Sequence, residues 1–228
     1  MKENTTHILV LIDRSGSMTS IATDIIGGFN QFIKKQKEIS GECFISLYQF
    51  DDIYEVVFER IKLQDVKDLD SNTYQPRNST ALYDAMGKTI DNYGKYLADL
   101  KEEERPGRVL FVTLSDGLNN ASREHTLKSV QDRVRHQTEK YGWDFVFLGS
   151  NIDAWEASGS LGIARSSTLQ FASCAGSVKN AYDALSKGAA SYRLSTKKAA
   201  YAFTQKDQDD QDQFLDDKQK SKAKKTTK

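Results

Sequence analysis

The aliphatic run from Ile8 to Ile12 is the feature that most constrains how this chain can fold. A strand buried on both faces of a parallel sheet has this continuous apolar pattern rather than an alternating one. The run is followed at once by the pentapeptide Asp13-Arg14-Ser15-Gly16-Ser17. One carboxylate and two hydroxyls therefore emerge together at the carboxyl end of a buried strand, where open α/β sheets form their binding crevices. Oxygen ligands of this kind suit a hard divalent cation such as Mg2+ or Mn2+.

Two later segments also place polar groups at the ends of predicted elements. Asn78-Ser79-Thr80 precedes a helical pattern, and the aliphatic run Val109 to Thr113 leads into Leu114-Ser115-Asp116-Gly117. The motif Asp-x-Ser-x-Ser, with a later Thr at a helix start and a later Asp after a strand, resembles the von Willebrand factor A domain. The resemblance covers most of the chain, from about residue 6 to residue 192. It implies a metal-ion-dependent adhesion site formed by Asp13, Ser15, Ser17, Thr80 and Asp116.

Ordinary structural roles are open for each of these side chains. Ser15 and Ser17 could cap the following helix, and Thr80 could be a helix N-cap. Asp116, which precedes a glycine, could simply form a turn. The chain also departs from the family pattern at Asn78-Ser79, because many members carry glycines immediately before the loop threonine. This difference leaves the backbone geometry of the second loop open.

Strand and helix patterns alternate along the chain, which is typical of a mostly parallel sheet covered by helices on both faces. Strands are predicted at 8–12, 44–50, 53–58, 109–113, 144–149 and 168–171, and helices at 21–33, 82–100, 127–141 and 178–192. The strands at 44–50 and 53–58 are too close for a crossover helix and should form an antiparallel hairpin. We therefore predict an α/β fold with a Rossmann-like, doubly wound, mostly parallel sheet and one antiparallel edge strand.

Composition predicts one soluble domain followed by a tail. The chain has 228 residues, of which 38% are hydrophobic and 28% charged, as is ordinary for a globular protein. From residue 204 the sequence becomes acidic and then Lys-rich, with too few apolar side chains to offset the entropy of ordering. The prediction is a von Willebrand factor A domain over 1–203 and a disordered charged tail over 204–228.

The charge balance and the amino-terminal sequence bear on location and partners. Lys+Arg and Asp+Glu each number 32, so no net field attracts nucleic acid or a membrane. The polar first six residues do not resemble a signal peptide, and no run is long and apolar enough to span a bilayer. We expect a cytoplasmic protein.

The ligand set implied by the resemblance predicts how the protein recognises its partner. Ser15, Ser17 and Thr80 are neutral, and in the family the two aspartates act mainly through bound waters, so the metal keeps much of its positive charge. A cation with an open coordination position attracts an external carboxylate. We therefore predict a protein partner that presents Asp or Glu to Mg2+ or Mn2+. The predicted contact surface around the metal includes Tyr74, Asn119 and Asn120.

An enzyme is the alternative. An Asp at the end of a first strand also resembles the haloacid-dehalogenase phosphatases, in which that residue is a nucleophile assisted by Mg2+. Those enzymes carry a second Asp two residues later as the general acid, and here that position is Ser15. No motif-like candidate for their catalytic lysine is evident. We therefore favour a non-enzymatic binding module over a phosphohydrolase that uses Asp13.

Overall fold

The computed structural model describes residues 1–150, 153–195 and 200–215 of the chain. Its strands are β1 (Lys2–Asp13), β2 (Glu42–Phe50), β3 (Tyr54–Lys62), β4 (Pro106–Ser115), β5 (Asp144–Ser150) and β6 (Thr168–Phe171). Its α-helices are α1 (Ala22–Lys37), α2 (Leu82–Asp99), α3 (Leu127–Tyr141), α4 (Ala154–Ser160), α5 (Ala175–Leu194) and α6 (Gln205–Asp212).

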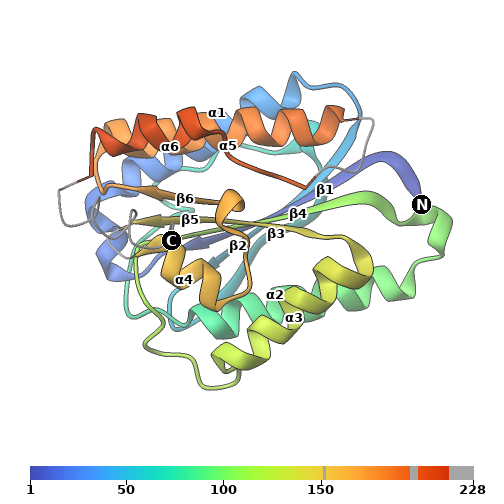
Figure 1. Cartoon of the computed structure of the whole chain (residues 1–228), viewed down its shortest axis with the longest axis horizontal. Coiled ribbons are helices and arrows are strands. Elements are labelled where there is room, and N and C mark those ends of the chain that lie inside the picture. Colours follow the sequence, from blue (N-terminus) through green and yellow to red (C-terminus); the bar gives the residue numbers. More distant parts are fainter. Residues whose placement is uncertain (151–152, 196–199, 216–228) are drawn as a thin grey trace.

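β1 lies in the middle of a six-stranded sheet with the order β3-β2-β1-β4-β5-β6 (Figure 1). It pairs in parallel with β2 on one side and with β4 on the other. The parallel arrangement continues from β4 to β5 and from β5 to β6. At the other edge, β3 pairs antiparallel with β2. The register places Asp13 opposite Phe50 of β2 and Ile12 opposite Leu114 of β4. The carboxyl ends of β1 and β4 therefore lie at the same edge, and the predicted fold class is confirmed.

Helices cover both faces of this sheet (Figure 1). α1, α5 and α6 lie over one face, and α2, α3 and α4 lie over the other. Ile8, Val10 and Ile12 of β1 pack into the core on the first side, while Leu9 and Leu11 pack into the core on the second. The aliphatic run is continuous because successive side chains of β1 point into opposite apolar layers.

The segment after residue 203 differs from the disordered tail that its composition predicts. α6 packs on α5, and Gln211 is 1% exposed. Its side-chain oxygen accepts a hydrogen bond from the Ser177 hydroxyl, and its side-chain nitrogen donates to the Ser177 carbonyl. The Phe214 ring lies so close to Gly176 that a Cβ there would approach the ring at 2.9 Å. A buried amide whose oxygen and nitrogen are both hydrogen-bonded, together with an aromatic contact, thus holds α6 on the domain, which a composition argument overlooks.

The rest of the predicted tail, residues 216–228, lies outside the described residues. Of the helices that the structure describes, none combines the length and the apolar character needed to cross a membrane.

Candidate metal centre

Three chain segments meet at the carboxyl edge of the sheet. The first is the 3-10 helix η1 (Gly16–Ile21), which follows β1. The Gly16 N–H donates to the Asn78 carbonyl at 3.0 Å, so the segment before α2 is joined to η1. The Asn120 N–H donates to the Thr80 carbonyl at 2.9 Å, which joins the same segment to the loop after β4. Main-chain hydrogen bonds therefore fix the three segments that carry the predicted ligands.

Asp13 is completely buried at the end of β1. Its Oδ1 accepts a hydrogen bond from the Ser15 N–H at 2.7 Å, and its Oδ2 accepts one from the Ser115 hydroxyl at 2.5 Å. Burial raises the pKa of this carboxyl to about 6, although both hydrogen bonds oppose the shift. The sequence prediction did not include Ser115, whose only signal was its position beside Asp116 at the end of the second aliphatic run.

Ser17 and Asp116 are in direct contact, although they lie on different segments. The Ser17 hydroxyl donates to Asp116 Oδ1 at 2.6 Å, and its oxygen lies 3.1 Å from the Ser15 hydroxyl oxygen. The second carboxylate oxygen, Asp116 Oδ2, is buried and has no hydrogen-bond partner within the described part of the chain. Burial raises the pKa of the Asp116 carboxyl. A buried, unpartnered carboxylate oxygen is costly, and it is rare unless a ligand or water completes it.

The helix-capping alternative is not supported for two of the hydroxyls. Ser15 is the N-cap residue of η1, but its side chain makes no capping hydrogen bond. The N-cap of α2 is Ala81, so Thr80 lies one residue before the cap. Thr80 is 3% exposed, and a Cβ added to Gly117 would lie 3.3 Å from its hydroxyl oxygen. The Thr80 hydroxyl is therefore adjacent to the residue that follows Asp116.

The prediction that Tyr74 is an aromatic anchor for a partner is wrong. Tyr74 is 1% exposed, and its hydroxyl donates to the Asp13 carbonyl at 2.6 Å. Burial raises the pKa of this hydroxyl well above its usual value. Gln49 of β2 holds the same loop, since its side-chain nitrogen donates to the Thr73 carbonyl at 3.0 Å. The loop folds back onto the sheet, so Tyr74 supports the end of β1 from inside.

Asn119 and Asn120 use their side-chain oxygens within the protein. Asn120 Oδ1 accepts a hydrogen bond from the Thr80 N–H at 2.8 Å. Asn119 Oδ1 accepts bonds from the Tyr83 N–H at 3.3 Å and from the Ser122 hydroxyl at 2.5 Å. These contacts attach the loop after β4 to the start of α2. Asn120 is exposed, and direct contact of either asparagine with a partner stays a prediction.

Asp84, in the first turn of α2, holds the next part of the same loop. Its carboxylate accepts hydrogen bonds from the backbone N–H groups of Arg123, Glu124 and His125 at 2.7–3.0 Å. These bonds lower the pKa of the Asp84 carboxyl against the effect of its burial, which is the largest single influence and acts in the opposite direction. Asp84 therefore fixes the loop that carries Asp116 against the helix that follows Thr80, a role that no sequence motif indicates.

The arginine within the pentapeptide is neutralised by the β2–β3 hairpin. Arg14 is 4% exposed, and its guanidinium lies 2.8 Å from Glu55 and 3.6 Å from Asp51. Arg77 lies 2.6 Å from the same Asp51 carboxylate. The two cations are thus matched by carboxylates of the hairpin, and no basic side chain of the described residues forms an ion pair with Asp13 or Asp116.

No model of a known protein family matches this chain, and no curated protein sequence matches it. Solved structures do share its fold. A von Willebrand factor type A structure from Catenulispora acidiphila is 9% identical with a TM-score of 0.56, over 81% of this chain and 42% of that one. This chain has a von Willebrand factor A fold.

Two further structures carry the same von Willebrand factor A fold. Proximal thread matrix protein 1 from the mussel byssus has a zinc-occupied metal-ion-dependent adhesion site (MIDAS) motif. It is 14% identical with a TM-score of 0.56, over 81% of this chain and 46% of that one. The pilus adhesin SpaC from Lactobacillus rhamnosus GG, in its open conformation, is 12% identical with a TM-score of 0.60, over 82% and 30%. This chain spans less than half the length of each of the three structures.

On this von Willebrand factor A scaffold, the donor atoms fit a hard cation. The predicted ligands offer only hydroxyl and carboxylate oxygens, and Asp116 Oδ2 has no partner within the described residues. No group of three or more His, Cys, Asp or Glu side chains in that same part of the chain is arranged to hold a metal. A cation at this edge would therefore depend on hydroxyls and water in addition to the two carboxylates.

Proposed function

We propose that this chain is a metal-dependent protein-binding module that recognises a carboxylate of its partner. The cation would be Mg2+ or Mn2+, and its ligands would be Asp13, Ser15, Ser17, Thr80 and Asp116. The observation that carries the proposal is Asp116 Oδ2, which is buried without a partner among the described residues at the point where the three ligand-bearing segments meet.

The charge of this ligand set favours an anionic partner. Three of the five groups are neutral hydroxyls, and both oxygens of Asp13 already accept hydrogen bonds from within the protein. A divalent cation here would keep much of its positive charge. In a partly buried site this charge interacts strongly with an incoming carboxylate, because the effective dielectric constant is lower than that of water.

The named structural neighbours are consistent with a binding role. One is described with a zinc-occupied MIDAS motif, and another is a pilus adhesin. For this chain we carry over the class of function, a binding module with a metal at the carboxyl edge of the sheet, and we propose the same ligand positions.

A phosphohydrolase fits the geometry less well. A nucleophilic aspartate needs a carboxylate oxygen free to attack phosphorus. Asp13 is completely buried, and each of its oxygens accepts a hydrogen bond. The position of a general acid two residues later is Ser15, so we propose that the site binds and does not hydrolyse.

Metal binding is tested on chelator-treated protein by calorimetry and thermal unfolding. We expect Mg2+ or Mn2+ to raise the melting temperature, since a ligand present at 100 times its Kd stabilises the folded state by about 2.7 kcal/mol. Asp116→Ala should remove this increment and keep the fold. The matched control is Asp91→Ala, because Asp91 is an acidic residue of α2 that pairs with Arg133, outside the site. An unchanged melting temperature of the wild type at millimolar metal would refute the ligand assignment.

Carboxylate recognition is tested with acetate as the probe and acetamide as its neutral counterpart. In the presence of Mg2+, acetate should shift the amide NMR signals of the three segments, and acetamide should not. Both compounds should have no effect after chelation. A metal that binds without any acetate response would mean that the cation is structural.

A further inference from the structure

An apolar groove lies directly beside the candidate metal centre. It lies among the start of α2, the loop after β4, the start of α3, and α4, with a volume of about 300 Å³. Its apolar walls are formed by Leu82, Tyr83, Leu118, Leu127, Ala157 and Leu161. A groove of this size accommodates one or two aliphatic side chains and is at the lower end of the range for ligand pockets, roughly 300–1,000 Å³.

Two leucines that line this groove are exposed to solvent. Leu118 is 65% exposed, the highest value among the large apolar side chains of the described chain, and Leu127 is 37% exposed. Leu118 follows the proposed ligand Asp116 by two residues. Contiguous exposed apolar patches rimmed by polar residues are typical of protein interaction surfaces, because a partner gains free energy by covering them.

Gly117 connects the groove to the metal centre. Gly117 lines the groove, and a Cβ at this position would lie 3.3 Å from the Thr80 hydroxyl oxygen. The backbone at Gly117 is therefore adjacent to both sites. Since an extended peptide advances about 3.3 Å per residue, a side chain one to four residues from a metal-bound carboxylate can reach the groove.

The far wall of the groove is acidic. It includes Asp153 and Glu156 of the α4 region, and the residues that line the groove include no Lys, Arg or His. Asp153 caps α4 by accepting a hydrogen bond from the Glu156 N–H, and Glu156 is exposed. This charge favours a basic partner residue next to the aliphatic one and disfavours a second acidic one.

We propose that this groove binds an aliphatic side chain of the same partner segment whose carboxylate reaches the metal. The occupant is an extended protein segment with an acidic residue, an aliphatic residue one to four positions away, and a basic residue beyond it. This inference rests on the proposed function, because the metal supplies the first contact. The continuity at Gly117, the exposed Leu118 and the acidic far wall together select this occupant.

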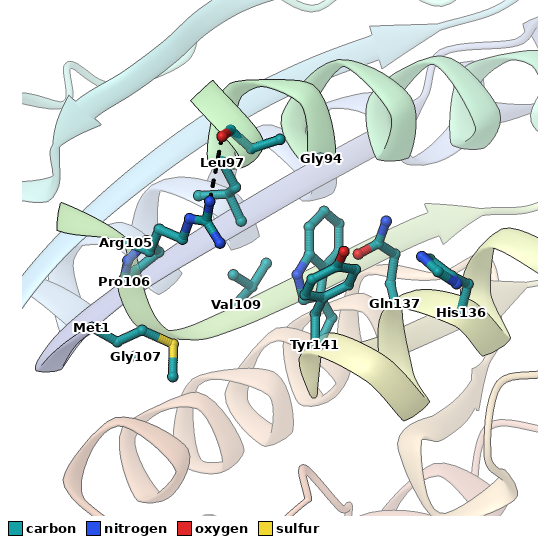
Figure 2. Close-up of a pocket in the computed structure, with 12 residues that line it drawn as sticks. Met1, Gly94, Leu97, Arg105, Pro106, Gly107, Val109, His136, Gln137 and Tyr141 are labelled. Atoms are coloured by element: carbon teal, nitrogen blue, oxygen red, sulfur yellow. Dashed lines mark hydrogen bonds between the residues drawn. The ribbon is translucent and has the colours of Figure 1, made fainter. Parts of the chain in front are cut away.

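A second apolar pocket provides an internal control. It is lined in part by Leu97, Val109, Tyr141 and Trp143, near the amino ends of β4 and β5 (Figure 2). Because it lies at the opposite edge of the sheet, a segment bound to the metal cannot occupy it. Tyr141 is 49% exposed, so its replacement changes an apolar surface away from the metal centre.

The test uses acetylated, amidated peptides with one Glu, one Lys, and a Leu placed one, two, three or four positions from the Glu. Binding is followed by amide NMR shifts in Mg2+. We expect at least one Leu peptide to bind about tenfold more tightly than the same peptide with Ser in place of Leu. Leu118→Ser should remove this preference, and Tyr141→Ser should keep it. The shifts should map to residues 117–127 and to α4.

The response to acetate distinguishes a failure of the groove inference from a failure of the proposed function. If acetate still binds in Mg2+ but no Leu peptide is preferred over its Ser counterpart, or if Leu118→Ser keeps the preference, the groove inference is overturned and the proposed function stands. If acetate and Mg2+ fail to bind, the proposed function is overturned. Leu-peptide binding that is independent of Mg2+ would also overturn the shared-segment inference, because the groove would then act without the metal.

Discussion

The two ends of β4 form very different surfaces with the same neighbours, α2 and α3. At the carboxyl end, one buried carboxylate oxygen of Asp116 has no partner among the described residues, and Asp84 in the first turn of α2 accepts backbone hydrogen bonds from the loop before α3. At the amino end, Val109 and Trp143 line an apolar pocket of about 230 Å³ between the last turns of the same helices (Figure 2). Both ends have an apolar pocket, but among the described residues the predicted ligand atoms gather at the carboxyl end. Donor atoms, rather than cavity shape, distinguish the candidate functional end.

The largest effect on stability is expected at the amino end. Trp143 is 3% exposed and contacts the rings of Tyr93 and Phe145. Trp143→Ala should lower the free energy of unfolding by about 3–5 kcal/mol, as measured by urea denaturation. The stabilisation by Mg2+ should remain as in the wild type. A lost metal response in a folded Trp143→Ala protein would contradict the separation of the two ends.

Asp84→Ala should have a smaller effect on stability and a larger one on metal binding. Removing the acceptor of three backbone N–H groups should cost about 2–3 kcal/mol and release the loop that carries Asp116. Metal affinity should fall about tenfold by calorimetry, and the amides of Arg123, Glu124 and His125 should exchange faster with solvent. The control is Asp91→Ala, which removes an exposed ion pair with Arg133 worth about 0.5 kcal/mol. Equal metal affinities in the two variants would show that Asp84 does not position the site.

Acidification should lower the free energy of unfolding through His7. This imidazole is buried between the Ser46 hydroxyl at 3.0 Å and the Tyr93 hydroxyl at 2.7 Å, and burial lowers its pKa from 6.5 to about 3. Between these values the unfolded chain binds a proton that the folded protein does not. The His7 contribution is therefore fully present above pH 6.5 and is lost as pH falls, by at most about 1.4 kcal/mol per pH unit.

The measurement is the difference in unfolding free energy between wild type and His7→Gln at several pH values from 7 to 4, which cancels the titration of groups common to both. We expect the unfolding free energy of the wild type to fall relative to that of His7→Gln as pH falls. A constant difference would mean that His7 titrates alike in the folded and unfolded chains.

The smallest effect is expected for Tyr74→Phe. The substitution keeps the buried ring but removes the hydrogen bond to the Asp13 carbonyl, and it should cost about 1 kcal/mol in urea denaturation. Because Tyr74 is buried, acetate binding in Mg2+ should change less than twofold. A large loss of acetate affinity with normal metal affinity would show that Tyr74 contributes to carboxylate binding.

The sequence predicted the parts of the molecule that depend on local pattern. The aliphatic runs before Asp13 and Asp116 located two central strands, and the close spacing of β2 and β3 predicted the hairpin. The same motifs predicted that Ser17 and Asp116, 99 positions apart, meet at one edge, as their hydrogen bond shows.

Features that depend on non-local packing were not predictable in this way. The orientation of Tyr74 is decided by how its loop folds back onto β1 and β2, which no periodicity records. Gln211 looks like one more polar residue in a charged tail until Ser177 of α5 supplies both of its hydrogen bonds. Asp84 likewise gains its role only from the backbone of a loop about 40 residues away along the chain.

The central position of β1 has a consequence for biosynthesis. Its inner neighbour β4 does not begin until Pro106, so a nascent chain carries the first aspartate of the site for about a hundred residues before the second strand can pair with it. Such long-range pairing forms late, after the cost of closing a long loop has been met. The ligand set is therefore incomplete until the centre of the sheet has closed. Under the proposed function, partner recognition at this edge would be restricted to chains in which β4 has paired with β1, and metal affinity would serve as a measure of that pairing.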